Sequence, residues 1–209
     1  MFDSPPALRP VPDGRRYGAV LADPPWRFIS YTAFDADRPR GRRDVERHYP
    51  TLDLAAICEL PVWRWASRDA HLFLWATGPC LEHAFAVIRA WGFRYSALGF
   101  NWVKLVRGRE AAPATIADGD LHLGAGHTTR HNSELCLLAR RGNPRRRARD
   151  VREVILAPVA EHSTKPEDCR ERIERYGDGP YLELFARTRR AGWDVWGDAF
   201  GGFVGAEEA

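Results

Sequence analysis

The chain has 209 residues, 44% of them hydrophobic, and a formal net charge of +3 at pH 7. This length can bury one substantial core, so we expect a single domain over residues 1–209, with residues 1–16 as a flexible N-terminal extension. No run of 18 or more apolar residues and no apolar signal core occur, which argues against membrane insertion and predicts a cytoplasmic location.

The basic residues are almost all arginine, because Lys104 and Lys165 are the only lysines in the sequence. The bias has two explanations: codon usage in a GC-rich genome, or selection for planar, bidentate contacts to phosphate. Two arginine-rich segments, 38–43 and 140–147, would suit a phosphate backbone if they lie beside an active site, and are otherwise solvated loops. The four cysteines form no C-x-x-C pair, so the sequence indicates neither a zinc site nor a disulfide framework.

Apolar runs of strand length alternate with segments of helical periodicity from residue 17 onward. The first run, 17–22, stops at an Asp-Pro-Pro turn and predicts a buried strand that ends in a loop. The other predicted elements are a helix capped by Thr51, a strand at 71–75, a helix over 81–91, a strand over 95–105, a loop over 106–126, strands at 135–138 and 154–156, a helix from Pro166 through Ile173, and a strand at 181–185.

Strands that alternate with helices predict an α/β fold, with a sheet of mainly parallel strands covered by helices on both faces. In such sheets ligands bind at the carboxyl ends of the strands. The residues at or just after the ends of the predicted strands are therefore the first candidates for a site: Asp23, Thr77, Lys104 and Arg187.

The strongest chemical signal is the motif Asp23-Pro24-Pro25-Trp26. A carboxylate at the end of a rigid strand can accept one hydrogen bond from a conjugated amine, such as the exocyclic amine of adenine. A carbonyl of the Pro-Pro turn can accept the second hydrogen bond from the same amine. The prolines remove backbone donors and fix the turn. The tryptophan would provide a face on which an extruded base can stack.

A second reading of the same four residues remains open. Asp and Pro are common turn formers, and the chain contains eight tryptophans, so the motif could be a turn followed by a core tryptophan. The motif alone does not decide between the two readings.

Residues 21–26 resemble the signature of the MT-A70-like adenine methyltransferases, a family whose members act on adenine in DNA or in RNA. The resemblance extends over most of the chain, from about residue 17 to residue 197. The matching segments are 21–26, 49–52, 71–78, 102–104, 133–136, 142–144, 163–166, 183–187 and 192–197.

The resemblance implies a Rossmann-like methyltransferase fold with permuted motif order, and S-adenosyl-L-methionine as the cofactor, released as S-adenosyl-L-homocysteine. It places Asp23 beside both the target amine and the cofactor. Lys165 corresponds to the lysine that reaches the methionine part of the cofactor, with Ser163 close by. Glu183 and Arg187 correspond to residues along the ribose and methionine side.

On the substrate side, the resemblance places Tyr49 and Glu134 near the target base, together with Trp26. One departure concerns the cofactor: the family usually has Asn and then Glu or Gln after the last matching segment, whereas this chain has Asp198-Ala199, which we retain as a cofactor contact through Asp198. The chemistry requires no metal, and His127 and His131 have no third ligand at a suitable spacing.

These observations predict transfer of a methyl group from S-adenosyl-L-methionine to the N6 amine of adenine in DNA. The preference for DNA over RNA depends on the compact organisation, which resembles prokaryotic and phage members of the family. The alternatives are an RNA adenine methyltransferase, methylation of cytosine at its exocyclic amine, and a catalytically inactive nucleic-acid-binding partner subunit. The expected partner is nucleic acid, and no interaction with a membrane is expected. The chain could also form a homodimer or bind a partner subunit.

Overall fold

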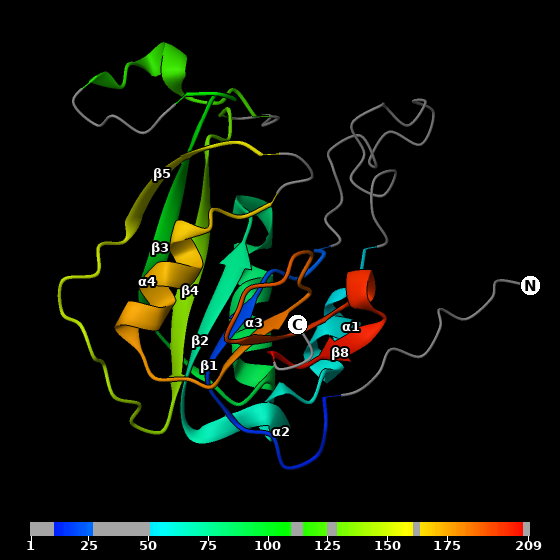
Figure 1. The fold of residues 1–209 in the computed structure, drawn as a ribbon. Helices are drawn as coiled ribbons and strands as arrows, with labels where there is room; N and C mark the ends of the chain where they lie inside the picture. The colour runs from blue at the N-terminus through cyan, green and yellow to red at the C-terminus, as the bar shows by residue number, and fades with distance from the viewer. Residues whose placement is uncertain (1–10, 27–50, 110–114, 125–128, 161–163, 207–209) are drawn as a thin grey trace, which may run out of the picture.

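The computed structural model of the chain describes residues 11–26, 51–109, 115–124, 129–160 and 164–206, which form one eight-stranded sheet with helices on both faces (Figure 1). The strands are β1 Tyr17–Ala22, β2 Ala66–Ala76, β3 Arg94–Leu105, β4 Ser133–Arg141, β5 Val154–Pro158, β6 Tyr181–Leu184, β7 Trp193–Gly197 and β8 Gly202–Val204. The helices are α1 Leu54–Glu59, α2 Val62–Trp65, α3 Leu81–Ala90 and α4 Asp168–Tyr176, with 3₁₀ turns η3 Gly78–Cys80, η5 Asp118–Asp120 and η7 Asp198–Phe200.

The strand order is β5-β3-β4-β2-β1-β6-β7-β8. Strand β1 lies at the centre and pairs in parallel with β2 and β6, and the pairs β6–β7 and β3–β5 are also parallel. Strand β4 runs antiparallel between β2 and β3, and β8 runs antiparallel to β7. The expected α/β fold with mainly parallel pairing is confirmed.

Helices α1 and α3 cover one face of the sheet, and α4 covers the other (Figure 1). On the first face Ile57 of α1 and Val87 of α3 are buried in one apolar cluster, and on the second face Cys169 and Ile173 of α4 are buried in another. Burial of apolar side chains on both faces explains why the central strand β1 is apolar along its whole length.

Several features differ from the sequence-based expectations, including the short helix α2, which was not predicted. Helix α1 is capped by Asp53, whose carboxylate accepts from the Ala56 N–H at 2.8 Å, and not by Thr51. Strands β7 and β8 were not predicted, because both are short and β7 contains the buried carboxylate of Asp194.

Asp194 fastens both ends of the described chain to the sheet. Its Oδ2 accepts from the Tyr17 hydroxyl at 2.5 Å and from the Arg15 guanidinium at 2.7 Å, and its Oδ1 accepts from the Ala206 N–H at 2.7 Å. Together with the burial of Val11, these contacts hold residues 11–16 against the domain, whereas residues 1–10 lie outside the described part.

Among the described residues, no helix is long and apolar enough to span a membrane. The chain between β3 and β4, which includes η5, extends beyond the sheet at the end where β3 finishes and β4 begins (Figure 1). The same end of the sheet carries the carboxyl ends of β1 and β2, because Ala22 of β1 faces Leu74 of β2 and Ala76 of β2 faces Leu135 of β4.

Candidate active site

A pocket opens at the carboxyl ends of β1 and β6, beside the start of α4. Its wall includes four of the predicted site residues, Asp23, Lys165, Glu183 and Arg187. Asp23 follows the last residue of β1, and Glu183 lies on β6, which pairs with β1. The parallel pairing of neighbouring strands therefore brings together side chains that lie 160 positions apart (183 − 23).

Lys165 is the central charge of this site. Its ammonium lies 2.6 Å from Asp23 Oδ2 and 3.2 Å from Glu134 Oε2, and it faces the Trp75 ring at 5.6 Å from the centroid. Glu134 is 9% exposed and receives a second cation, because Lys104 Nζ lies 2.5 Å from its Oε1. The four side chains form a row of alternating charges, Asp23, Lys165, Glu134 and Lys104.

The pairing favours the ionised forms of the two most buried groups, Glu134 and Lys165. Burial alone would raise the pKa of Glu134, but Lys165 and Lys104 outweigh burial and hold that pKa below its ordinary value. Burial alone would lower the pKa of Lys165, but Asp23 and Glu134 together raise it. Lys165 is therefore a cation at neutral pH, in contact with the Asp23 carboxylate.

The Pro-Pro turn is held firmly by hydrogen bonds. The carbonyl of Pro24 accepts from the Trp26 N–H at 2.8 Å, and the carbonyl of Pro25 accepts from the Leu52 N–H at 3.0 Å. Each carbonyl oxygen has a second lone pair, so either one can still accept from a bound molecule. The backbone that carries Asp23 is thus fixed before any ligand binds.

Trp26 does not present a stacking face in this conformation. Its ring is 6% exposed within the apolar core, and its indole N–H donates to the Trp75 carbonyl at 3.0 Å. A base needs an open ring face to stack, so the stacking role expected for Trp26 is not supported by this geometry. The visible role of Trp26 is to join the turn to β2.

Glu183 has an internal partner, Arg170 of α4. The Arg170 guanidinium binds the carboxylate with both prongs, Nε to Oε2 at 2.7 Å and Nη2 to Oε1 at 2.9 Å, and the two residues are 7% and 9% exposed. Burial nevertheless raises the pKa of Glu183 above its ordinary value. Bidentate pairing leaves one lone pair on each oxygen of Glu183 for a further donor.

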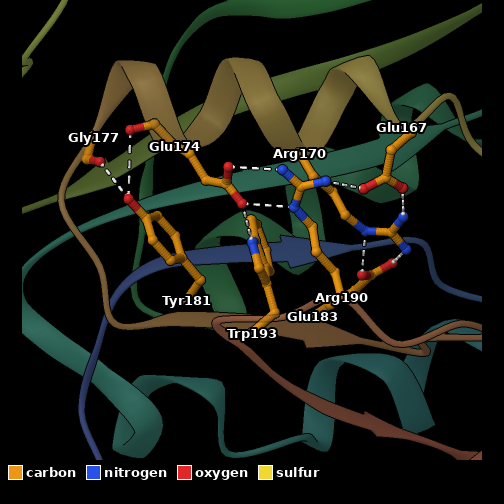
Figure 2. A network of polar contacts seen from close by, with 8 residues as sticks. All are labelled: Glu167, Arg170, Glu174, Gly177, Tyr181, Glu183, Arg190 and Trp193. Atoms are coloured by element: carbon orange, nitrogen blue, oxygen red, sulfur yellow. Dashed lines mark hydrogen bonds and ion pairs between the residues drawn. The ribbon is translucent and has the colours of Figure 1, made fainter. Parts of the chain in front are cut away.

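The Arg170–Glu183 pair belongs to a larger polar network between α4 and strands β6 and β7 (Figure 2). Arg190 binds Glu174 through two nitrogens, at 2.7 and 2.8 Å, and also contacts Glu167. Glu174 further accepts from the Trp193 indole N–H at 2.7 Å. These contacts fasten the segment between β6 and β7, which contains Arg187, onto α4.

Several predicted positions fall outside the part of the chain that the structure describes. They are Tyr49, Ser163, His127 and the arginine-rich segment 38–43, and the side chain of Asp198 is also not described. Arg187 is exposed at the pocket wall.

The second arginine-rich segment, 140–147, lies away from the pocket. Strand β4 begins beside Ala76 of β2 and ends with Arg141 beside Ala70, so this segment starts at the opposite edge of the sheet. Between Leu135 and Arg141 the strand covers roughly 20 Å. These arginines therefore do not lie beside the active site, where they were expected to suit a phosphate backbone.

One important residue of the site, Arg170, was not predicted from the sequence. Arg170 has no motif of its own, although the apolar run around Glu183 implies that this carboxylate needs a buried partner. Lys104 was predicted as a candidate because of its place at a strand end, but its pairing with Glu134 was not predicted; the available signal is that Lys104 is one of two lysines in the chain.

Comparison with known proteins shows that the chain is similar to methyltransferases. The family model for MT-A70 matches residues 17–199. The type II methyltransferase M.MunI of a Mycoplasma species is 29% identical over 196 residues, which cover 88% of this chain and 77% of that protein. The N(6)-adenosine-methyltransferase catalytic subunit METTL3 of Homo sapiens is 30% identical over 177 residues, which cover 82% of this chain and 26% of METTL3.

A plant relative has nearly the same identity to this chain as the human one, over a similar share of its length. The N(6)-adenosine-methyltransferase MT-A70-like protein of Arabidopsis thaliana is 29% identical over 192 residues, or 89% of this chain and 24% of that protein. The chain thus spans about a quarter of the length of these two relatives and about three quarters of M.MunI.

The buried Arg170–Glu183 pair predicts a large loss of stability when one partner is removed. Replacing Arg170 with Met leaves an unpaired buried carboxylate, and we expect the free energy of unfolding to fall by about 3–5 kcal/mol in chemical denaturation. Arg175→Met, on the same helix in an exposed pair with Asp150, should cost under about 1 kcal/mol. The double variant Arg170→Met/Glu183→Gln should recover part of the loss, and equal losses in the single and double variants would contradict the pairing argument.

Glu174 predicts a specific dependence of stability on pH. Hydrogen bonding from Arg190 holds the folded-state pKa of Glu174 below its ordinary value, so the pair contributes stability that is complete above the unfolded-state pKa and is lost as pH falls through the folded-state value. We expect the free energy of unfolding to decline between about pH 5 and about pH 3 more steeply in the wild type than in Glu174→Gln. Glu171→Gln, an exposed change on the same helix, should keep the wild-type slope; identical slopes in all three proteins would refute this assignment.

Proposed function

The chain belongs to the MT-A70 family, and on this basis we propose that it transfers a methyl group from S-adenosyl-L-methionine to the N6 amine of adenine in DNA. The observation that carries the proposal is the Asp23–Lys165 ion pair, at 2.6 Å, in the wall of a pocket at the carboxyl end of the central strand. Open α/β sheets bind their ligands at this place.

The chemical character of the pocket wall fits this cofactor. Asp23 and Glu183 provide carboxylates, and Lys165 and Arg187 provide cations, which suits a molecule with ribose hydroxyls, an ammonium, a carboxylate and a sulfonium. Trp75 lines the same pocket, and its buried indole nitrogen has no hydrogen-bond partner among the described residues. A buried donor without a partner is expected where a ligand completes the wall.

When bound, S-adenosyl-L-methionine supplies a methyl group on a positively charged sulfur and leaves as S-adenosyl-L-homocysteine. In the proposed arrangement Lys165 would use its ammonium to hold the cofactor carboxylate while it keeps its contact with Asp23. Glu183, held by Arg170, would use its remaining lone pairs to accept from ribose hydroxyls. Asp198, Ser163 and Arg187 complete the proposed cofactor residues.

Asp23 is the residue that we assign to the target amine. Because Lys165 occupies Oδ2, Oδ1 is the oxygen available to accept a hydrogen bond from the N6 amine of adenine. A carbonyl of Pro24 or Pro25 can accept the second hydrogen with its free lone pair. Two fixed acceptors orient the nitrogen lone pair away from the ring plane and toward the methyl donor, which is catalysis by positioning.

The resemblance places Tyr49 and Glu134 on the base side. Each oxygen of Glu134 binds one lysine, so we assign Glu134 mainly the electrostatic task of holding Lys165. We assign direct contact with the base to Asp23, the Pro-Pro carbonyls and Tyr49.

The choice of DNA is supported by the extent of the similarity. The chain spans 77% of the type II methyltransferase M.MunI, but only 26% of METTL3, whose name specifies adenosine, the ribonucleoside. The alternative, adenine in RNA, is favoured by the number of N(6)-adenosine-methyltransferases among the relatives, at 28–30% identity.

The proposal predicts methyl transfer that depends on the charge of Asp23. With labelled S-adenosyl-L-methionine, we expect the wild type to form N6-methyladenine in duplex or single-stranded DNA at a higher rate than in RNA, measured by nucleoside analysis. Asp23→Asn keeps the side-chain shape but removes the negative charge, and should lower kcat by on the order of 100-fold or more.

The matched control is Asp13→Asn, which removes an exposed carboxylate outside the pocket and should retain wild-type activity. A higher rate on RNA would select the alternative substrate. Cofactor binding without transfer to any polymer would instead identify the chain as an inactive partner subunit.

A further inference from the structure

Both lysines of the chain converge on one carboxylate, Glu134. Lys104 Nζ lies 2.5 Å from Oε1 and Lys165 Nζ lies 3.2 Å from Oε2. The sequence has 31 lysine and arginine residues, of which 29 are arginine (31 − 2). Both exceptions to this strong bias therefore occur at Glu134, and one of them, Lys165, places a compact ammonium between two carboxylates.

Lys165 is shared between two carboxylates that compete for it. Its ammonium is closer to Asp23, at 2.6 Å, than to Glu134, at 3.2 Å. The Glu134 side chain is 10% exposed and the Lys165 side chain 14%, so water provides little compensation for either charge. In such surroundings the position of a shared cation depends on how well each carboxylate is neutralised by its other partners.

Lys104 is the other partner of Glu134, and its position is fixed on several sides. Its backbone N–H donates to the Asn132 carbonyl and its carbonyl accepts from the His122 N–H, both at 2.8 Å. Its ammonium lies 4.9 Å from the centroid of the Trp102 ring, and its side chain is 16% exposed. The Lys104 charge is therefore held beside Glu134 by the fold.

We propose that Lys104 is a positioning residue of the methyl-transfer site, which neutralises Glu134 and thereby leaves Lys165 bound mainly to Asp23. Lys104 acts through Glu134 and Lys165 and does not touch Asp23. The effect on Lys165 follows from the charges alone, whereas its consequence for catalysis rests on the proposed function.

The proposal has a defined consequence when Lys104 is replaced with Met. Among the described residues Glu134 then has Lys165 as its one remaining counter-ion, so Lys165 moves toward Glu134 and its contact with Asp23 weakens. The groups that face Glu134 are Lys104 from β3 and Lys165 from the segment before α4, with Asp23 competing for Lys165. Loss of Lys104 therefore also raises the pKa of Glu134.

The small number of lysines permits a direct spectroscopic test. Protein labelled with ¹⁵N at lysine Nζ should give two ammonium signals, assigned with Lys104→Met and Lys165→Met. In Lys104→Met we expect the Lys165 signal to shift clearly from its wild-type position, whereas in Lys104→Arg, which keeps the charge, it should stay closer. Arg94→Met, at the other end of β3, is the matched control and should leave both signals in place.

An unmoved Lys165 signal in a folded Lys104→Met protein would overturn the proposal. If this variant does not fold, Glu134→Gln applies the same test, because loss of the shared carboxylate must shift both lysine signals. A shift of only one of them would refute the coupling.

Activity provides the second readout. We expect kcat of Lys104→Met to fall by on the order of 10- to 100-fold with little change in KM for the nucleic acid, and partial recovery in Lys104→Arg. The acid limb of the pH profile should move to higher pH, because Glu134 loses a cation. Wild-type kcat and an unchanged profile in Lys104→Met would contradict the proposal, whereas absence of transfer by the wild type would refute the proposed function and leave the spectroscopic test valid.

Discussion

The ion pair between Lys165 and Asp23 is the interaction on which the rest of the site depends. It joins the end of the central strand β1 to the segment that leads into α4, at a place where neither charge is well solvated. An isolated buried charge would be costly, so the pair has to be accompanied by further partners. Glu134 and Lys104 provide them on one side, and the Arg170–Glu183 pair adds a second set of matched charges across the pocket.

The mixed directions of the strands explain how these residues meet. Strands β1, β2 and β6 are parallel and end at one edge, where they carry Asp23, Trp75 and Glu183. Strand β4 runs in the opposite direction, so its beginning, with Glu134, lies at this same edge, next to the end of β3 with Lys104. A fully parallel sheet would place Glu134 at the far edge. The row of charges therefore requires that β4 runs antiparallel. The same strand direction places the arginines that follow β4 at the opposite end of the strands.

Much of the fold and part of the site follow from local sequence patterns. Apolar runs and turn residues predict β1 and α3 well, because each buries a continuous apolar stretch or stripe. Asp23 is predictable since it follows a buried strand, and Lys165 and Glu183 follow from the family resemblance. A buried Trp26 was one of two readings of the motif, and the sequence did not decide between them because it does not specify which face of the turn packs against β2. The pairing of Glu183 with Arg170, and the convergence of both lysines on Glu134, depend on tertiary register, which no local pattern encodes.

The pocket around Asp23 and Lys165 is the proposed site of the methyl donor. Calorimetric titration of the purified chain with S-adenosyl-L-methionine, in the wild type and in Lys165→Met, measures this binding. We expect one saturable site in the wild type and a loss of affinity of at least about tenfold in the variant, equivalent to about 1.4 kcal/mol. Equal affinity in the two folded proteins would show that the cofactor binds elsewhere.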